Sequence, residues 1–576
     1  MRPFLVGAMN TSPHGNNSDS HRPVIMSNNG MVASGHPLAS EAGINILRNG
    51  GNVIDAALAV ASTLSVVEPM MSGIGGDGYM MVYWKETDSI HVINGTGAAP
   101  LSCTPSQFKN DGIPSKGIMS VSTPGLLNAW FDAHEKFGSL SLSQIFNDAI
   151  NLATNGFPVT HYLSNAIGED PFLCNFPASQ EIFTHKGIPL QPGEKLIQKN
   201  LGASLKTIAT EGRESFYKGK IAEQLIQFVT LHDGILSLED LTRCHSRWEK
   251  PISTNYKGHT VYETPPNSSG HVLLQELNIL ESFDITKFSR DSSELIHIMI
   301  EAKKLAFDDR EHFLCDPDFK DIPINGLLSK AYANLRAEQI DTNKANKVIV
   351  PGNPWDYQEQ PPKSNTSLKK GVKEESENTT CFVLMDKDGN AVCQLQSLQS
   401  AWGSGMIAGE TGILLNNRMT YWNLEPDHIN YLVPGQRTRH TMNAVMVFDE
   451  SLNKRCLEWV LGTPGADTQV QSNFQVLVNL IDFDLNITEA VEYPRWKDIL
   501  SPTESNYPHT FTNEVVIEDR FAPEILTDLE NKGHKIRKLN AWDGLVGREM
   551  IIKANSSTNT LEGAADPRYD GYVSCW

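Results

Sequence analysis

A strongly polar segment stands directly before an apolar hairpin, and this junction constrains the chain more than any other feature. Residues 351–378 read PGNPWDYQEQPPKSNTSLKKGVKEESEN, a composition that predicts a mobile linker because it offers almost nothing to bury. Residues 379–398 contain two strand-like runs around a turn signal at 388–390, which predicts a hairpin. The junction is either an ordinary linker between domains or a place where the chain is cut before Thr379.

A cut would give Thr379 its own base. A threonine hydroxyl is a weak nucleophile, but the α-amine of an N-terminal threonine lies beside it and has an unperturbed pKa of about 7.7 to 8.0. In the intact chain that nitrogen is an amide, so activity on this interpretation requires cleavage between Asn378 and Thr379. Acyl transfer also needs N–H donors for the oxyanion, and the turn GTPGADT at 462–468 is either such a donor site or a structural loop.

Apolar periodicity predicts three helices. Residues 37–51 have one apolar face and end at a glycine pair, residues 55–69 are apolar on every face, and residues 290–315 carry a long apolar stripe. The first 29 residues are polar and are predicted to be disordered, with order starting at residue 30.

Charge and cysteine usage exclude several classes of function. The net charge of −20 argues against nucleic-acid binding, which needs a basic surface. None of the eight cysteines has C-x-x-C or zinc-ligand spacing, so neither a metal nor a cofactor is expected. No run of 18 apolar residues occurs, and the apolar stretch at 4–9 is too short for a signal peptide. The expected location is cytoplasmic, with no membrane contact.

Several motifs together resemble the γ-glutamyltranspeptidase family. They occur in family order from about residue 30 to the last residue, and they include GIGGDGYMMVY, PPNSSGHVLLQELNILE, ENTTCFVLMDKDGNAVCQLQS, LGTPGADTQVQ and GAADPRYDGY. The resemblance implies an α+β fold, the four-layer αββα sandwich of N-terminal-nucleophile hydrolases, built from both halves of a self-cleaved precursor. The halves would be a large subunit, 30–378, and a small subunit, 379–576, that stay associated.

The resemblance also implies roles for four catalytic residues. Thr379 falls on the catalytic threonine, and Ser397 falls where the family has a second hydroxyl that hydrogen-bonds the nucleophile. Gly465 and Ala466 fall on the pair of residues whose N–H groups form the oxyanion hole, normally two glycines.

The pocket departs from the family pattern. Thr96 replaces the arginine that binds the substrate carboxylate, and a threonine cannot form a bidentate charged pair. Tyr421 replaces the acidic residue that binds the substrate amine. The other substrate-binding positions that differ are Gln399, Arg418, His440 and Thr441.

Arg418, Arg439 and His440 are hypothesised to recognise an anionic substrate that lacks an α-amine; an ion-pair role within the protein is the alternative. The predicted function is a self-processing threonine amidohydrolase or acyltransferase of glutathione-hydrolase type. Two alternatives stay open: an oxamate- or cephalosporin-acylase-like enzyme acting on a non-glutamyl acidic amide, and a pseudoenzyme that only binds. The expected partners are a small, acidic amide and the two subunits of one precursor, and a homo-oligomer is left open.

Overall fold

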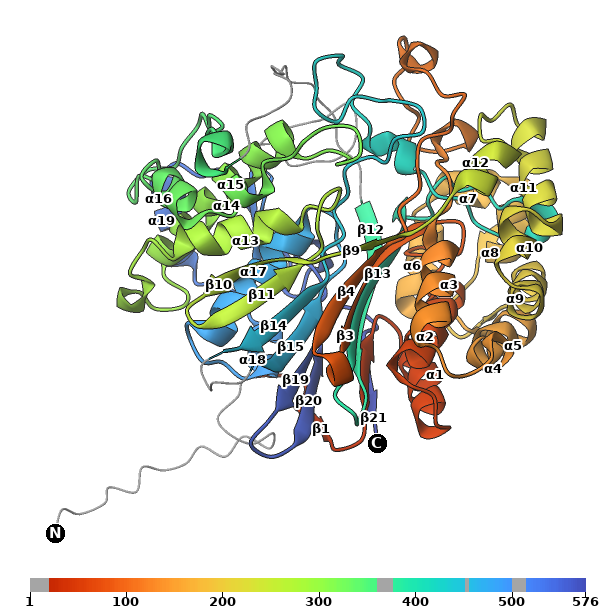
Figure 1. Ribbon diagram of the computed structural model, residues 1–576, viewed down its shortest axis with the longest axis horizontal. Coiled ribbons are helices and arrows are strands. Elements are labelled where there is room, and N and C mark those ends of the chain that lie inside the picture. The colour runs from red at the N-terminus through yellow and green to blue at the C-terminus, as the bar shows by residue number, and fades with distance from the viewer. Residues whose placement is uncertain (1–19, 360–376, 451–454, 500–513) are drawn as a thin grey trace.

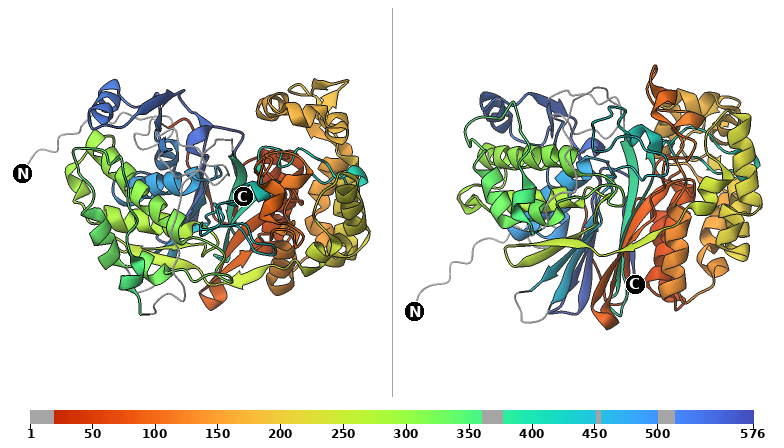
Figure 2. Two further views of the ribbon diagram at one scale, coloured as in Figure 1. Left: turned by 90° about the horizontal axis from the view of Figure 1, so that it is seen from above. Right: turned by 45° about the horizontal axis from the view of Figure 1, so that its top comes forward.

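Two seven-stranded sheets pack face to face, and helices cover the outer face of each (Figure 1). The computed structural model describes residues 20–359, 377–450, 455–499 and 514–576. Figure 2 shows from two further directions that the helices keep to the outside of the paired sheets. The four-layer αββα architecture expected from the resemblance is therefore confirmed.

The first sheet interleaves strands from both sides of the predicted cut. Its neighbours all run antiparallel. The hairpin that follows the cut lies at its centre, between strands that precede the cut. The order is β21 (Tyr572–Cys575), β2 (Met31–Ser34), β12 (Glu377–Met385), β13 (Ala391–Ser400), β3 (Asp77–Trp84), β4 (Ser89–Asn94) and β9 (Arg247–Glu249).

The second sheet is interleaved in the same way, with three strands that precede the cut at its two edges. Its order is β1 (Ile25–Ser27), β20 (Thr560–Ala565), β19 (Met550–Asn555), β15 (Cys456–Gly462), β14 (Val445–Asp449), β11 (His259–Glu263) and β10 (Ile252–Tyr256). A small sheet lies beside it, made of β16 (Trp496–Asp498), β17 (Val515–Glu518) and β18 (Ile536–Leu539).

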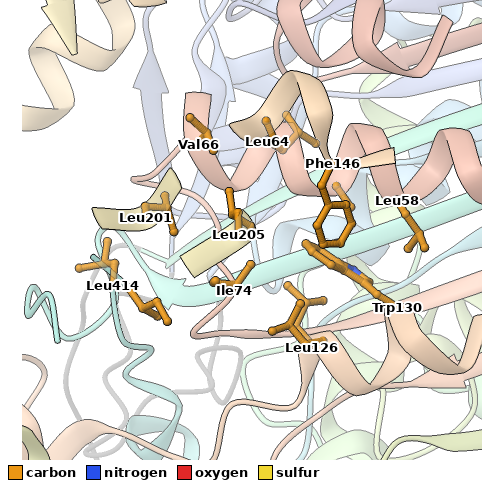
Figure 3. Packing of buried hydrophobic residues seen from close by; sticks show 14 of the residues in the cluster. Leu58, Leu64, Val66, Ile74, Leu126, Trp130, Phe146, Leu201, Leu205 and Leu414 are labelled. Carbon is orange, nitrogen blue, oxygen red and sulfur yellow. The ribbon is translucent and has the colours of Figure 1, made fainter. Parts of the chain in front are cut away.

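The helices over the first sheet are built around one that is buried on all sides. α2 (Val53–Val67) has no exposed residue, which explains its lack of a polar face, and a capping box at Asn52 fixes its start. Figure 3 shows Leu58 of this helix in a cluster of apolar side chains with Trp130 and Phe146. The other helices of this layer are α1 (Pro37–Arg48), α3 (Leu126–Phe137), α4 (Leu142–Ile145), α5 (Asn147–Asn155), α6 (His161–Gly168), α7 (Pro171–Asn175), α8 (Pro177–Phe183), α9 (Lys199–Glu211), α10 (Arg213–Tyr217), α11 (Lys220–Leu231) and α12 (Leu238–Arg243).

The helices over the second sheet also come from both sides of the cut. Those before it are α13 (Gly270–Leu280), α14 (Ser293–Phe313), α15 (Ile324–Leu327) and α16 (Lys330–Ala337); those after it are α17 (Thr468–Ile481), α18 (Ile487–Glu492) and α19 (Pro523–Asn531). The predicted helices at 37–51, 55–69 and 290–315 thus exist as α1, α2 and α14. Within the described ranges, no helix is long and apolar enough to cross a bilayer.

Two predicted boundaries are wrong where the structure describes them. Order begins before residue 30, because β1 (Ile25–Ser27) pairs with β20; residues 1–19 lie outside the described residues. At the predicted linker, 351–359 packs on the body, with Pro354 buried and the Gly352 N–H 3.3 Å from the Asp309 carboxylate. Residues 377 and 378 already belong to β12, and 360–376 lie outside the described residues.

Candidate active site

The predicted cut site lies in a β-bulge at the start of β12, at the upper end of the sandwich in Figure 1. The register shifts between Asn378 and Thr380, so that Thr379 alone opposes two residues of β13, Ser397 and Leu398. Thr379 is buried, with 3% of its surface exposed. Bulges recur next to active sites, where they re-aim side chains.

The bulge places the Ser397 hydroxyl on the peptide bond that would be cut. This hydroxyl donates to the Asn378 carbonyl oxygen at 2.7 Å and accepts from the Gln399 N–H at 2.7 Å. The Asn378 carbonyl carbon is the atom that the Thr379 hydroxyl must attack to cleave the chain. Negative charge then develops on the carbonyl oxygen, and a donor already in place stabilises it.

The turn at Gly465 and Ala466 directly precedes α17. Both residues have positive φ, +117° and +47°, and the Thr468 N–H donates to the Gly465 carbonyl oxygen at 2.8 Å as the helix begins. Among the described residues, no acceptor takes the N–H of Gly465 or of Ala466. Two unused N–H donors at the positive end of a helix suit a developing oxyanion.

A close crossing of strands brings this turn to the start of β12. A Cβ atom on Gly462, the last residue of β15, would lie 2.8 Å from the Cys381 sulfur and 3.2 Å from the Cys393 sulfur. Only glycine allows β15 to approach β12 and β13 so closely. Two residues further on, Pro464 lines one small cavity with Thr380. Pro464, which precedes Gly465, and Thr380, which follows Thr379, therefore line the same cavity.

An ion pair from α14 holds the same turn. The Arg310 guanidinium donates to both carboxylate oxygens of Asp467, with Nη2 at 3.3 Å from Oδ2, and Nη2 lies 2.9 Å from Oε1 of Glu311. All three side chains are buried. Because Asp467 follows Ala466 directly, Arg310 positions the turn from the part of the chain that precedes the cut.

A buried polar cluster surrounds Asp77, beside Ser397. Asp77 is the first residue of β3 and the register partner of Ser397. Nε and Nη2 of Arg418 donate to its two carboxylate oxygens at 2.9 and 2.8 Å, and Nε2 of His440 lies 3.1 Å from Oδ2. Asp77 was not among the site residues predicted from sequence.

Two further predicted pocket residues join this cluster. The Tyr421 hydroxyl lies 3.0 Å from Oγ1 of Thr441, and the Arg418 guanidinium stacks over the Tyr421 ring, 4.6 Å from its centre. The structure thus brings together Arg418, Tyr421, His440 and Thr441. It also pairs the Arg418 charge with a carboxylate, so anion recognition by Arg418 stays a prediction.

The ionisation states in the cluster follow from burial and from the arginine. Burial opposes the charge on Asp77, but Arg418 and His440 outweigh it and lower the pKa of Asp77 to about 2. Burial and then the Arg418 charge lower the pKa of His440 to about 4, against the opposing pull of Asp77. His440 is therefore neutral at neutral pH. Its Nδ1 accepts from the Met442 N–H at 3.4 Å, so its proton sits on Nε2 and faces Asp77.

Thr96 reaches the cluster through two intermediate residues. Its hydroxyl donates to Oδ1 of Asn94 at 2.6 Å, and Nδ2 of Asn267 donates to it at 3.3 Å. Oδ1 of Asn267 also accepts from the Tyr79 hydroxyl at 2.8 Å. The Tyr79 ring packs edge-on against the ring of His440. Thr96 therefore belongs to the same polar network, without bringing a charge to it.

Gln399 and Arg439 occupy different surroundings. Gln399 is the register partner of Asn378 and has a φ of +89°, so it stands directly beside the predicted cut. Nη1 of Arg439 lies 2.5 Å from Oε1 of Glu311, and both side chains are buried. Arg439 thus has the internal ion-pair contact that was the alternative to substrate recognition, and its role towards substrate stays a prediction.

Four residues of this region were missed from sequence: Asp77, Tyr79, Asn267 and Arg310. A signal existed for one of them. Asp77 stands in the run GIGGDG at the entrance to a buried strand, and a carboxylate in such a place needs a charged or hydrogen-bonding partner. Nothing local identifies that partner, because Arg418 lies 341 residues further along the chain.

The fold and the threonine at a bulged strand start define the class: an amide hydrolase with an N-terminal nucleophile, made as a precursor. More narrowly, the chain belongs to the gamma-glutamyltranspeptidase family, whose sequence profile matches residues 39–576. It is 35% identical to a glutathione hydrolase-like proenzyme of Bacillus subtilis, over 94% of this chain and 97% of that protein. It is 35% identical to a glutathione hydrolase proenzyme of Escherichia coli, over 96% and 93%.

A solved structure extends this comparison to the fold. The crystal structure of a cephalosporin acylase from Bacillus halodurans superposes with a TM-score of 0.85 at 33% identity, covering 98% of this chain and 99% of that one. The predicted family, fold class and reaction class are confirmed by these findings. The relatives named as glutathione hydrolases agree with the predicted function, and the cephalosporin acylase agrees with its enzymatic alternative.

Proposed function

We propose that the chain cuts itself between Asn378 and Thr379, and that the freed Thr379 then cleaves the amide bond of a small γ-glutamyl compound of the glutathione type. The observation that most supports the cut is the hydrogen bond from Ser397 to the Asn378 carbonyl oxygen. It polarises the one peptide bond whose cleavage would free this threonine.

Self-cleavage consumes one water. The Thr379 hydroxyl adds to the Asn378 carbonyl carbon, the C–N bond breaks, and the acyl group passes to the hydroxyl as an ester. Water then hydrolyses the ester, which leaves a carboxylate on Asn378 and an amine on Thr379. The new amine takes up the hydroxyl proton in each later turnover.

Turnover repeats this chemistry on an external amide. Thr379 attacks the substrate carbonyl, the N–H groups of Gly465 and Ala466 stabilise the oxyanion, and the amine leaves with the proton. An acyl-enzyme remains until water or another amine releases the acyl group. Arg310 keeps the donor turn in place through Asp467.

A small acidic amide without an α-amine is the second candidate substrate, favoured by the polar cluster. Thr96 and Tyr421 bring no charge for the two ends of a glutamyl head, whereas Arg418 brings a guanidinium beside Ser397's register partner. Its pairing with Asp77 reduces but does not remove the attraction for an anion. The similarity to a cephalosporin acylase is consistent with this candidate.

A denaturing gel with N-terminal sequencing tests the cut. We expect two bands, with the smaller one beginning at Thr379. A single band, or a small subunit that begins at another residue, refutes the proposal. The Thr379→Ala variant should give one band, and Thr380→Ser, which changes the neighbouring threonine but keeps its hydroxyl bond to Glu68, should still be cut.

The substrate is tested by comparing kcat/KM for glutathione, a γ-glutamyl anilide, oxamate and a glutaryl amide. A clear preference for the γ-glutamyl compounds supports the first candidate, and a preference for the other two supports the second. Arg418→Met should raise KM for the acidic amides more than for a neutral amide. Arg439→Met tests the other arginine hypothesised to recognise an anion: if both variants change this selectivity equally, Arg418 has no role of its own.

A further inference from the structure

A buried group of three metal-binding side chains lies outside the site described above. Within the residues that the structure describes, one group of three or more His, Cys, Asp or Glu side chains has the spacing of a metal site: His297, Glu301 and His534. One ligand atom of each lies within 4.8 Å of the others, and all three residues are buried. The reaction derived above uses none of them.

Two helices and one turn build this group. His297 and Glu301 are four residues apart on α14, so they share one face of the helix. His534 follows α19 in the turn before β18, where its N–H donates to the Leu529 carbonyl oxygen at 3.1 Å. α14 and α19 lie side by side in the outer helical layer (Figure 1).

The hydrogen bonds of His297 leave its Nδ1 lone pair directed at the other two side chains of the group. Its Nε2 lies 2.8 Å from the Asp341 carbonyl oxygen, so Nε2 carries the proton and Nδ1 carries the lone pair. Nδ1 lies 2.7 Å from Nε2 of His534, which therefore donates to it. A metal-binding histidine usually donates its other N–H to a carbonyl or carboxylate in this way.

Glu301 keeps lone pairs for a further bond. Its Oε1 accepts from Nζ of Lys304 at 2.6 Å, and its Oε2 accepts from the Asn346 N–H at 3.0 Å. Each carboxylate oxygen can accept two bonds. Lys304 and Lys532 both face the histidines, so a bound cation must hold its ligands strongly enough to overcome these charges.

We propose that His297, Glu301 and His534 form a binding site for one divalent transition metal of the Zn²⁺ class. Two imidazole nitrogens and one carboxylate select Zn²⁺, Co²⁺ or Ni²⁺ over Mg²⁺ and Ca²⁺, which prefer oxygen ligands. For His534 to bind the metal through Nε2, its one ring proton moves to Nδ1, so both histidines bind as neutral imidazoles. A small rotation of the His534 ring opens the nitrogen pair to the spacing of about 3.4 Å that a tetrahedral site needs.

The site also joins the two halves of the precursor. His297 and Glu301 precede the proposed cut, and His534 follows it. A bound metal therefore ties the large subunit to the small one at the outer helical layer. This bridging role rests on the proposed cut, whereas the metal site itself does not.

Metal titration of the full, processed protein, freed of any purification tag and treated with a chelator, tests the site. We expect one equivalent of Co²⁺ to give visible absorption bands, and Zn²⁺ to abolish them. His534→Ala should weaken Zn²⁺ binding more than about 100-fold. His185→Ala, which removes an exposed histidine elsewhere, should not change it. No stoichiometric binding to the wild-type protein, or unchanged binding to His534→Ala, overturns the proposal.

Lys304→Met is a second test, which does not depend on whether His534→Ala folds correctly. Lys304→Met removes the cation beside Glu301, so it should tighten Zn²⁺ binding if Glu301 is a ligand; unchanged or weaker binding excludes Glu301. Zn²⁺ should raise the Tm of the wild-type protein and of uncut Thr379→Ala, but not that of His534→Ala. Because uncut Thr379→Ala carries the same three ligands, failure of the proposed cut and failure of the metal site give different results.

Discussion

The Ser397 hydroxyl donates a hydrogen bond of 2.7 Å to the carbonyl oxygen of Asn378. The bond crosses the β-bulge at which Thr379 stands alone against two residues of β13. A polarised carbonyl and the hydroxyl proposed to attack it thus occupy neighbouring residues in the intact chain.

Ser397→Ala should slow self-cleavage by about 10²- to 10³-fold, which is the usual cost of removing one donor from an oxyanion. The time course of the two bands on a denaturing gel measures this rate. Ser400→Ala, which changes another buried serine of β13, should leave the rate within about threefold of wild type. An unchanged rate in Ser397→Ala would show that this hydrogen bond has no part in the cut.

Breaking the Asp77–Arg418 pair from either side should be costly. Among the described residues, Arg418→Met leaves the buried Asp77 carboxylate with His440 as its one remaining side-chain partner. The expected loss is about 3–5 kcal/mol of unfolding free energy. Asp77→Asn should cost a similar amount, and the double variant should cost clearly less than the sum. Urea unfolding of the uncut Thr379→Ala background measures all four proteins; strict additivity would show that the pair is not coupled.

Ala466→Gly should be tolerated in both stability and activity. Ala466 has a φ of +47°, a conformation that costs a residue with a side chain about 1–2 kcal/mol and costs glycine nothing. The N–H donor stays in place, so kcat should remain within about threefold of wild type. Ala466→Pro is the informative contrast, because it removes the donor and cannot adopt a positive φ; if it retains full kcat, this N–H does not serve the oxyanion.

His440 should add a definite term to the pH dependence of stability. Its folded pKa of about 4 lies below the unfolded value of about 6.5, so the unfolded chain binds a proton that the folded protein refuses. The stabilisation is complete above pH 6.5 and falls by about 1.4 kcal/mol per pH unit on acidification towards pH 4. His440→Gln should remove this slope relative to wild type in urea titrations.

Glu549 provides the control of opposite sign. Burial raises its pKa to about 8, so the folded protein keeps a proton that the unfolded chain releases, and its contribution rises as the pH falls from 8 towards 4.5. Glu549→Gln should therefore change the pH slope in the direction opposite to His440→Gln. If both variants shift it in the same direction, the assigned protonation states are wrong.

Local patterns were sufficient to predict the elements that carry their own signals. α1 and α2 follow from their apolar spacing and caps, and the hairpin of β12 and β13 follows from its turn. β1 could not be predicted, because three residues gain their order only by pairing with β20, more than 500 residues further along the chain. Its stability comes from a partner and not from its own sequence.

The site shows the same division. The resemblance supplied Thr379, Ser397 and the turn at Gly465, because these lie in continuous motifs. It could not supply the partners of Arg418 and Arg439, since each ion pair forms between segments distant in sequence. Charged residues aligned with a pocket were therefore predicted to face substrate, whereas the structure shows carboxylates of the protein against both.

The hairpin of β12 and β13, which carries Thr379 near its start, is inserted between β2 and β3 from the part of the chain that precedes the proposed cut. β12 and β13 each pair with a strand on both sides. After cleavage this pairing could form only if the two separate polypeptides reassociated. The sheets are therefore expected to fold before the chain is cleaved. The two separate polypeptides of the mature enzyme then have no simple route to refold into the same sheets. Unfolding of the cleaved protein is therefore expected to be irreversible.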